Sequence, residues 1–208
     1  MAGSAPVAWW WESLAGEQRW CGHADESPPP GSPPDGWAFA TVALDEHDLW
    51  WVEPVTGGIP RTTRAIPGSA LPVSAPCRDD HARIDGARAA LGAADLARDA
   101  RVLEVRGADD WARLVTSHPR RMQRAGAEWS TWTGWAGTWR QPDWASVAGA
   151  WDGVHVTVGA YLEGAYRPLP VGAGMTILAG WNPDETVWLG PGIGGYRPVT
   201  TAPGRSRG

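Results

Sequence analysis

The sequence predicts an α+β fold in which a twisted, mostly antiparallel sheet packs against two or three helices, with an N-terminal Trp-rich β segment. Three observations predict it: short strand-like segments separated by Pro and Gly, two segments with helical periodicity, and abundant tryptophan. The 208 residues contain 16 Trp but only one Phe. Because each buried indole removes about 150–250 Å² from water, tryptophan can build the core that aliphatic side chains usually form.

The chain divides into four segments that we expect to form one compact unit. Residues 1–75 form the Trp-rich β segment, with frequent Pro and Gly. Residues 76–100 are a connector, predicted to be helical because residues 82–100 are rich in Ala and Arg. Residues 101–200 form the α+β core, and residues 201–208 form a loose tail. The total length suits a single domain.

The clearest elements lie at the start of the core segment. Residues 101–106 contain two Val and one Leu and predict a strand. A helix follows, with Asp109 and Asp110 as the expected caps at its start and Pro119 at its end. Its apolar positions have helical spacing: Trp111, Leu114, Val115 and His118.

A second helix is predicted from Pro142-Asp143, and three strands follow it. The apolar face of this helix consists of Trp144, Val147, Ala148 and Trp151. Asp152 begins a turn, and residues 154–158 alternate as a strand. Residues 175–180 and 185–189 predict two further strands.

Residues 100–190 resemble a group of Trp-rich actinomycete proteins to which no reaction is firmly assigned. The resemblance rests on an ordered series of short segments: residues 108–115, 142–148, 151–158, 161–162 and 179–189. It covers about half of the chain and implies that the α+β core is an intact domain. It implies no ligand, reaction or site residue.

The composition excludes several classes of function. All 18 basic residues are Arg, so the chain forms neither a lysine Schiff base nor a standard phosphate-binding P-loop. The net charge of -5 argues against nucleic-acid binding. No apolar stretch approaches 18 residues, and residues 1–11 lack a basic leader. We therefore expect no membrane span, no signal peptide and a cytoplasmic location.

His155 is the candidate catalytic group. Alternation places the valines of residues 154–158 on one face of their strand, and His155 with Thr157 on the other. If the valines face the core, the opposite face opens onto a cleft, a covering helix or water. An imidazole can act as a general base near neutral pH, and Tyr161 and Asp152 are its expected assistants. The alternative is a hydrogen-bonded histidine within the sheet.

The predicted substrate-binding residues are tryptophans and polar groups around that face. Trp132 and Trp135 belong to a run of spaced indoles that either pack in the core or offer aromatic faces to a flat or cationic ligand. An arginine suits an anionic group on the ligand. The full set is Thr157, Trp132, Trp135, Trp181, Thr186, Trp188 and Arg106.

We predict neither a metal nor a cofactor. Cysteine and histidine form a legitimate zinc set, but their spacing here is not that of a zinc finger, and the sequence leaves the question open. The set is Cys21, His23, Cys77 and His81. The glycine run at residues 190–195 fits a dinucleotide fingerprint, yet too few residues follow it for the required helix and acid. We interpret it as a turn.

A further alternative is an ADP-ribosyltransferase-like protein that uses NAD. One class of these enzymes has an Arg at a strand end, an aromatic-Ser-Thr strand and a late Glu. Arg106, residues 129–131 and Glu185 occur in that order. Pro183 stands where the class usually has Gln or Glu, which departs from the pattern.

The leading functional hypothesis is a small-molecule-binding protein, either an enzyme or an accessory subunit of specialised metabolism. In this hypothesis tryptophans wall the pocket and His155 supplies acid–base chemistry. The alternative is a non-enzymatic interaction subunit, in which exposed tryptophans of the first 75 residues bind a partner protein.

Overall fold

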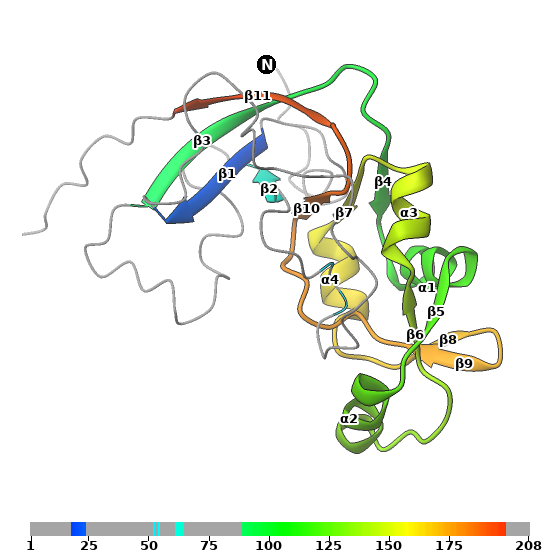
Figure 1. Cartoon of the computed structure of the whole chain (residues 1–208). Coiled ribbons are helices and arrows are strands. Elements are labelled where there is room, and N and C mark those ends of the chain that lie inside the picture. Colours follow the sequence, from blue (N-terminus) through cyan, green and yellow to red (C-terminus); the bar gives the residue numbers. More distant parts are fainter. Residues whose placement is uncertain (1–17, 24–51, 53, 55–60, 65–88, 199–208) are drawn as a thin grey trace, which may run out of the picture.

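A seven-stranded sheet is the centre of the computed structural model, which describes residues 18–23, 52, 54, 61–64 and 89–198 (Figure 1). The strands lie in the order β11-β3-β1-β2-β10-β7-β4. Their bounds are β1 Gln18–His23, β2 Arg61–Arg64, β3 Ala89–Leu96, β4 Val102–Val105, β7 Gly153–Val156, β10 Glu185–Trp188 and β11 Ile193–Pro198.

Every neighbouring pair in this sheet is antiparallel except one. Strand β4 runs parallel to β7, with Leu103 beside Val154 and Glu104 beside His155. This pair places β4 at one edge of the sheet, and β11 forms the other edge. The predicted α+β fold with a mostly antiparallel sheet is therefore confirmed.

Four helices occur among the described residues: α1 Ala108–Ser117, α2 Arg124–Thr133, α3 Trp144–Ala150 and α4 Val158–Gly164. Helices α1, α3 and α4 gather around the β4–β7–β10 end of the sheet, and α2 lies farther out (Figure 1). Two short hairpins accompany them: β5 Pro119–Arg121 with β6 Arg140–Pro142, and β8 Leu169–Val171 with β9 Gly174–Thr176. Helix α4 was not expected, because Val158 continues the alternation of the preceding strand.

The two predicted helices form, but their first turns differ. In α1 the N-cap is Gly107, which provides no side-chain hydrogen bond, so the expected capping by aspartate is wrong. Asp110 instead accepts the backbone N–H of Arg106. In α3, Asp143 is a true cap and accepts the N–H of Ser146 at 3.1 Å.

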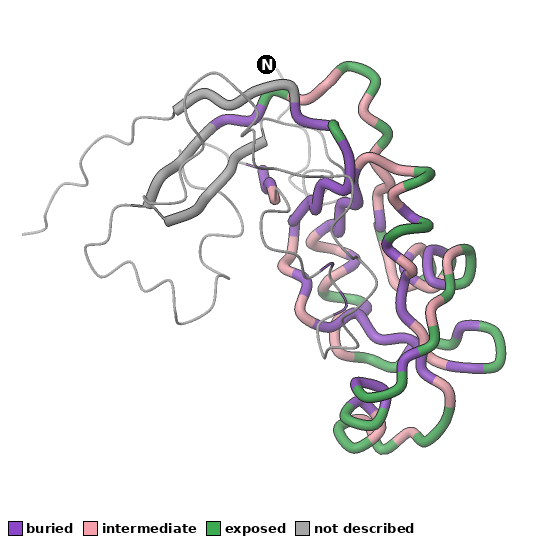
Figure 2. The backbone as a smooth tube through the Cα atoms, viewed as in Figure 1, coloured by how far each residue is buried: buried purple, intermediate pink, exposed green. Residues whose placement is uncertain are grey.

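Buried indoles make up much of the core, in two groups. The rings of Trp111, Trp144 and Trp181 lie 5.7–6.5 Å apart between centroids. Their N–H groups donate to Thr176, the Val52 carbonyl and the Glu185 carbonyl, so none is left unsatisfied. The second group consists of the buried Trp129 and Trp139 with the partly buried Trp135, and its rings stack edge to face. Figure 2 shows the buried backbone concentrated where the helices meet the sheet.

The connector is not helical where the structure describes it. Residues 89–96 form strand β3, which pairs with β1 on one side and β11 on the other. Two hydrogen-bonded neighbours override the helix propensity of the alanines, and Gly92 weakens a helix at this point. Strands from three of the four expected segments thus share one sheet.

Other expectations lie outside the described residues. These include most of the Trp-rich segment, residues 82–88 and the tail at 201–208. In the part of the chain that is described, no helix combines the length and apolar composition needed to cross a bilayer.

Candidate functional site

The face of β7 that carries His155 does not open onto a cleft. Val154 and Val156 are buried in the main core, as the alternation predicts. His155 and Thr157 are also completely buried, at 0% exposure each. The expectation of an accessible His155–Thr157 face is therefore wrong, because both faces of this central strand are covered. A substrate does not reach the imidazole in this structure.

Asp184 is the centre of a buried polar cluster that includes His155. Its Oδ2 accepts hydrogen bonds from the Thr63 hydroxyl at 3.0 Å and the Arg64 backbone N–H at 2.8 Å. Its Oδ1 accepts from Arg64 Nε at 2.6 Å and lies 3.5 Å from His155 Nε2. We call Thr63, Arg64, His155 and Asp184 the Asp184 cluster; all four are buried.

The Asp184 cluster holds its carboxylate in the ionised form. Burial raises the pKa of Asp184, but His155 and the Arg64 guanidinium outweigh burial and hold it below its ordinary value of 3.8. Asp184 also adopts a left-handed backbone conformation, with φ of 63°. Asp184 directly precedes β10, and its two carboxylate oxygens contact residues of β2 and β7. It therefore links the start of β10 to both of these strands.

The two expected assistants of His155 have other contacts. Asp152 accepts the backbone N–H and the guanidinium of Arg101, at 2.7 and 2.9 Å. Hydrogen bonding from Arg101 lowers the pKa of Asp152. Tyr161, on α4, is half-buried and packs against the main core. Since Asp152 pairs with Arg101 and His155 lies against Asp184, Asp152 does not assist His155 as predicted.

Thr157 and Thr186 are buried rather than exposed to a ligand. Thr157 is the N-cap of α4, and its hydroxyl accepts the Ala160 N–H at 3.1 Å. Thr186 lies on β10 beside His155 and is 0% exposed. Their side chains therefore belong to the interior of the fold.

The predicted tryptophans do not wall one pocket. Trp181 and Trp188 are buried, and Trp135 packs against Trp139. Trp132 is 54% exposed and stacks edge to face on Tyr166.

Trp188 explains part of the glycine run. Its ring lies so close to Gly153 and Gly192 that an added Cβ would meet it at 3.0 and 2.2 Å respectively. Its N–H donates to the Thr62 hydroxyl at 2.9 Å. Gly192 therefore allows the chain to pass over an indole before β11 begins.

The pattern expected for an NAD-dependent transferase also fails at one element. Residues 129–131 lie in helix α2, not in a strand. Arg106 follows the end of β4 as expected, and Glu185 is buried at the start of β10. Without the aromatic-Ser-Thr strand, this hypothesis loses the element that would shape the nicotinamide site.

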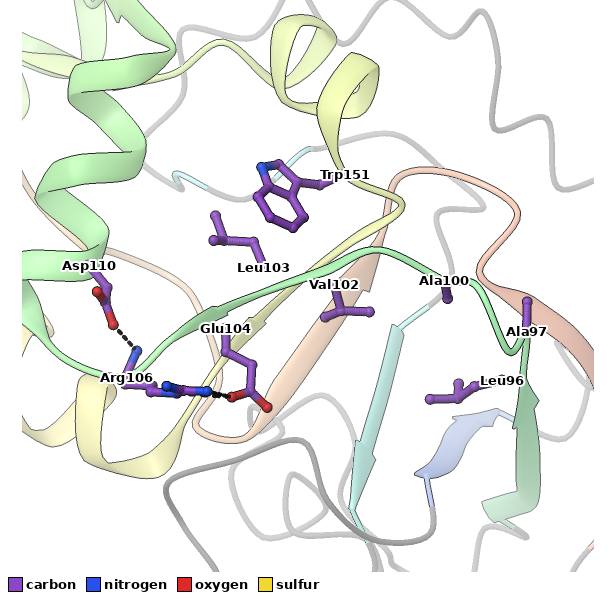
Figure 3. Close-up of a pocket in the computed structure, with 9 residues that line it drawn as sticks. All are labelled: Leu96, Ala97, Ala100, Val102, Leu103, Glu104, Arg106, Asp110 and Trp151. Carbon is purple, nitrogen blue, oxygen red and sulfur yellow. Dashed lines mark hydrogen bonds and ion pairs between the residues drawn. The ribbon is translucent and has the colours of Figure 1, made fainter.

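A concave site does exist beside the edge strand β4 (Figure 3). This groove, which we call the β4 groove, has a volume of about 510 Å³. Its apolar part comes from the link between β3 and β4, from β4 itself and from the end of α3. The residues are Leu96, Ala97, Ala100, Val102, Leu103 and Trp151.

The polar end of the β4 groove is formed by Glu104, Arg106 and Asp110. Arg106 Nε and Nη2 both donate to Glu104 Oε2, at 3.0 and 2.7 Å. The carboxylate of Asp110 accepts the Arg106 backbone N–H at 2.9 Å and forms an ion pair with Arg113. The Arg106 side chain is 65% exposed, whereas that of Glu104 is 16% exposed. The hydrogen bonds that Arg106 donates to the Glu104 carboxylate raise the pKa of Arg106.

Of the predicted site residues, Arg106 alone lines this groove. Sequence reasoning missed Trp151, Glu104 and Asp110 as site residues. One signal was present: Glu104 and Arg106 are two residues apart on a strand and therefore share a face. Trp151 carried no such signal, because its helical spacing indicated only an apolar face.

No cluster of three or more potential metal-ligating side chains occurs among the described residues. Cys77 and His81 lie outside the described residues, so the described part does not contain the full cysteine–histidine set.

The chain matches no protein-family model, and comparisons with curated proteins and with solved structures give no significant match.

Proposed function

We propose that the protein binds a small molecule in the β4 groove. One observation carries the proposal: an indole, several aliphatic side chains and the Glu104–Arg106 pair line one concave site along the edge strand β4 (Figure 3). Trp151 and Leu103 lie on one side of this strand, and Glu104 and Val102 lie on the other. Pockets for small ligands are mostly apolar, contain a few placed polar groups and measure about 300–1,000 Å³. The β4 groove falls within this size range, and its lining combines apolar and polar surface in similar amounts.

The elements around the groove divide the work of binding. Trp151 follows the last turn of α3 and is half-buried, so its ring is held by packing while part of it stays accessible. Leu103 and Val102 add apolar surface from β4. A planar or aliphatic ligand body placed against these side chains removes apolar surface from water, both its own and that of the side chains.

We propose binding rather than turnover. The ionisable residues that line the groove are Glu104, Arg106 and Asp110, and all three already contact one another or Arg113. The histidine suggested as an acid–base group is buried in the Asp184 cluster. A binding or accessory role in specialised metabolism agrees with this arrangement better than proton transfer by His155.

Filling the groove tests the proposal. The Ala97→Phe variant places a ring where the ligand body would lie, and Ala127→Phe adds the same ring to an exposed position on α2. Ligand-observed NMR with aryl and alkyl carboxylates, amides and amines identifies binders, and calorimetry measures their affinity. We expect Ala97→Phe to weaken binding at least tenfold, and Ala127→Phe to leave it unchanged. Absence of any binder, or equal loss in both variants, would refute the proposal.

A further inference from the structure

The remaining hydrogen-bonding capacity of Arg106 indicates what kind of ligand fits the β4 groove. A guanidinium carries five N–H donors in one plane. Glu104 Oε2 takes two of them, one on Nε and one on Nη2, which occupies one edge of the plane. The other edge, formed by Nη1 and Nη2, carries two parallel N–H groups. The side chain that presents it is 65% exposed.

The carboxylates of the groove are less available than this edge. Glu104 already accepts two N–H groups of Arg106, and Asp110 is engaged by the Arg106 backbone and by Arg113. A cationic ligand has to compete with arginines that are part of the chain. An anionic ligand displaces only water from Arg106.

The local charges also permit an anion. Two arginines, Arg106 and Arg113, balance two carboxylates, Glu104 and Asp110. Glu104 is mostly buried and holds the guanidinium in one orientation, so less side-chain entropy is lost when a ligand binds. Glu104 is thus a positioning residue for Arg106.

We infer that the β4 groove selects a small monocarboxylate, whose carboxylate pairs with the Nη1–Nη2 edge of Arg106 while its apolar body lies against Val102, which shares a face of β4 with Glu104. A single guanidinium edge matches the two oxygens of one carboxylate. The inference rests on the proposed function and adds the chemical class of the ligand.

Matched probes that differ only in charge test this inference. The probes are 3-phenylpropanoate, indole-3-acetate and octanoate, each with its amide and its corresponding amine, titrated by calorimetry. We expect the carboxylate of at least one scaffold to bind at least tenfold more tightly than its amide, with the amine weakest. Arg106→Gln should bring carboxylate and amide to equal affinity. Arg106→Lys should restore part of the preference for carboxylate, because lysine keeps the positive charge but lacks the two parallel N–H donors of the guanidinium.

Arg167→Gln is the matched control, since it removes the same charge from an exposed arginine that lies outside the groove and donates to the Glu163 carbonyl. It should retain the preference for carboxylate. Unchanged thermal melting of Arg106→Gln establishes that the variant is folded. A preference for amide or amine, or one that survives Arg106→Gln, overturns the inference and leaves the proposed function standing if Ala97→Phe still blocks binding. Failure of every probe to bind overturns both.

Discussion

Two groups of arginine and carboxylate side chains in this protein share their chemistry and differ in their access to water. In the Asp184 cluster, Arg64 and Asp184 have side chains at 2% and 0% exposure. At the β4 groove, Arg106 is 65% exposed and Glu104 is 16% exposed. Because the first group is buried, its side chains contact only other parts of the protein interior. In the second group, the exposed N–H donors of Arg106 are accessible to a ligand.

The physical reason is the solvation of charge. Removing an ion pair from water is costly, and only complete hydrogen bonding and close approach offset that cost. Asp184 meets this requirement with contacts to both of its oxygens. An exposed pair contributes only about 0–1 kcal/mol to stability, so Arg106 can take a ligand on its other edge at little cost to the fold.

The largest expected difference between the groups is in stability. Asp184→Asn removes the buried charge that pairs with Arg64 and should lower the free energy of unfolding by about 3–5 kcal/mol. Asn tolerates the left-handed conformation at this position, so the change reports the charge and not backbone strain. Urea denaturation measures the loss.

Asp110→Asn is the exposed counterpart and should change stability by less than about 1 kcal/mol. Equal effects of the two substitutions would show that burial does not separate the two groups.

Acid should weaken the buried group in a defined direction. The pKa of Asp184 is lower in the folded state than its ordinary value of 3.8, so the unfolded chain binds a proton first as the pH falls. The stabilisation by Asp184 is therefore complete above pH 3.8 and is lost as the pH falls through the folded-state pKa. The stability difference between wild type and Asp184→Asn should shrink across this window in urea titrations. A difference that is constant down to pH 3 would contradict the assignment.

A smaller effect than that of Asp184→Asn concerns Thr157, which the sequence suggested as a ligand contact and the structure shows as a cap. Thr157→Ala removes the hydroxyl that accepts the Ala160 N–H and should cost about 1 kcal/mol of stability. Thr157→Ser keeps this hydroxyl and should retain most of the stability. Chemical denaturation of the two variants separates capping from the loss of the methyl group, and equal losses would argue against a capping role.

Helical periodicity and cap chemistry were readable from the sequence because they are local. The spacing of Trp111, Leu114 and Val115 predicted the buried face of α1, and Asp143 predicted the start of α3. The alternation around His155 was also correct for the buried valines. The strand at 89–96 was missed, because its partners β1 and β11 are distant in the chain and outweigh local propensity.

The candidate site was predictable only in part, for a related reason. The sequence indicated Arg106 as a donor for an anionic ligand. Glu104 lies two residues before it, on the same face of the predicted strand. Trp151 joins them from the end of α3, and Ala97 and Ala100 from the link between β3 and β4. No local pattern brings these residues together.

By itself, the sequence determined the periodic faces, the helix starts and the use of indoles as core side chains, since each depends on neighbours within a few residues. Only the tertiary structure decided which polar residues meet water. His155 is enclosed because β7 is flanked by β10 and β4 and covered on both faces, whereas Arg106 stays exposed because it follows the end of an edge strand. Solvent exposure depends on contacts between segments that are distant in the chain. A buried charged residue serves the fold, whereas an exposed one is available to bind a ligand.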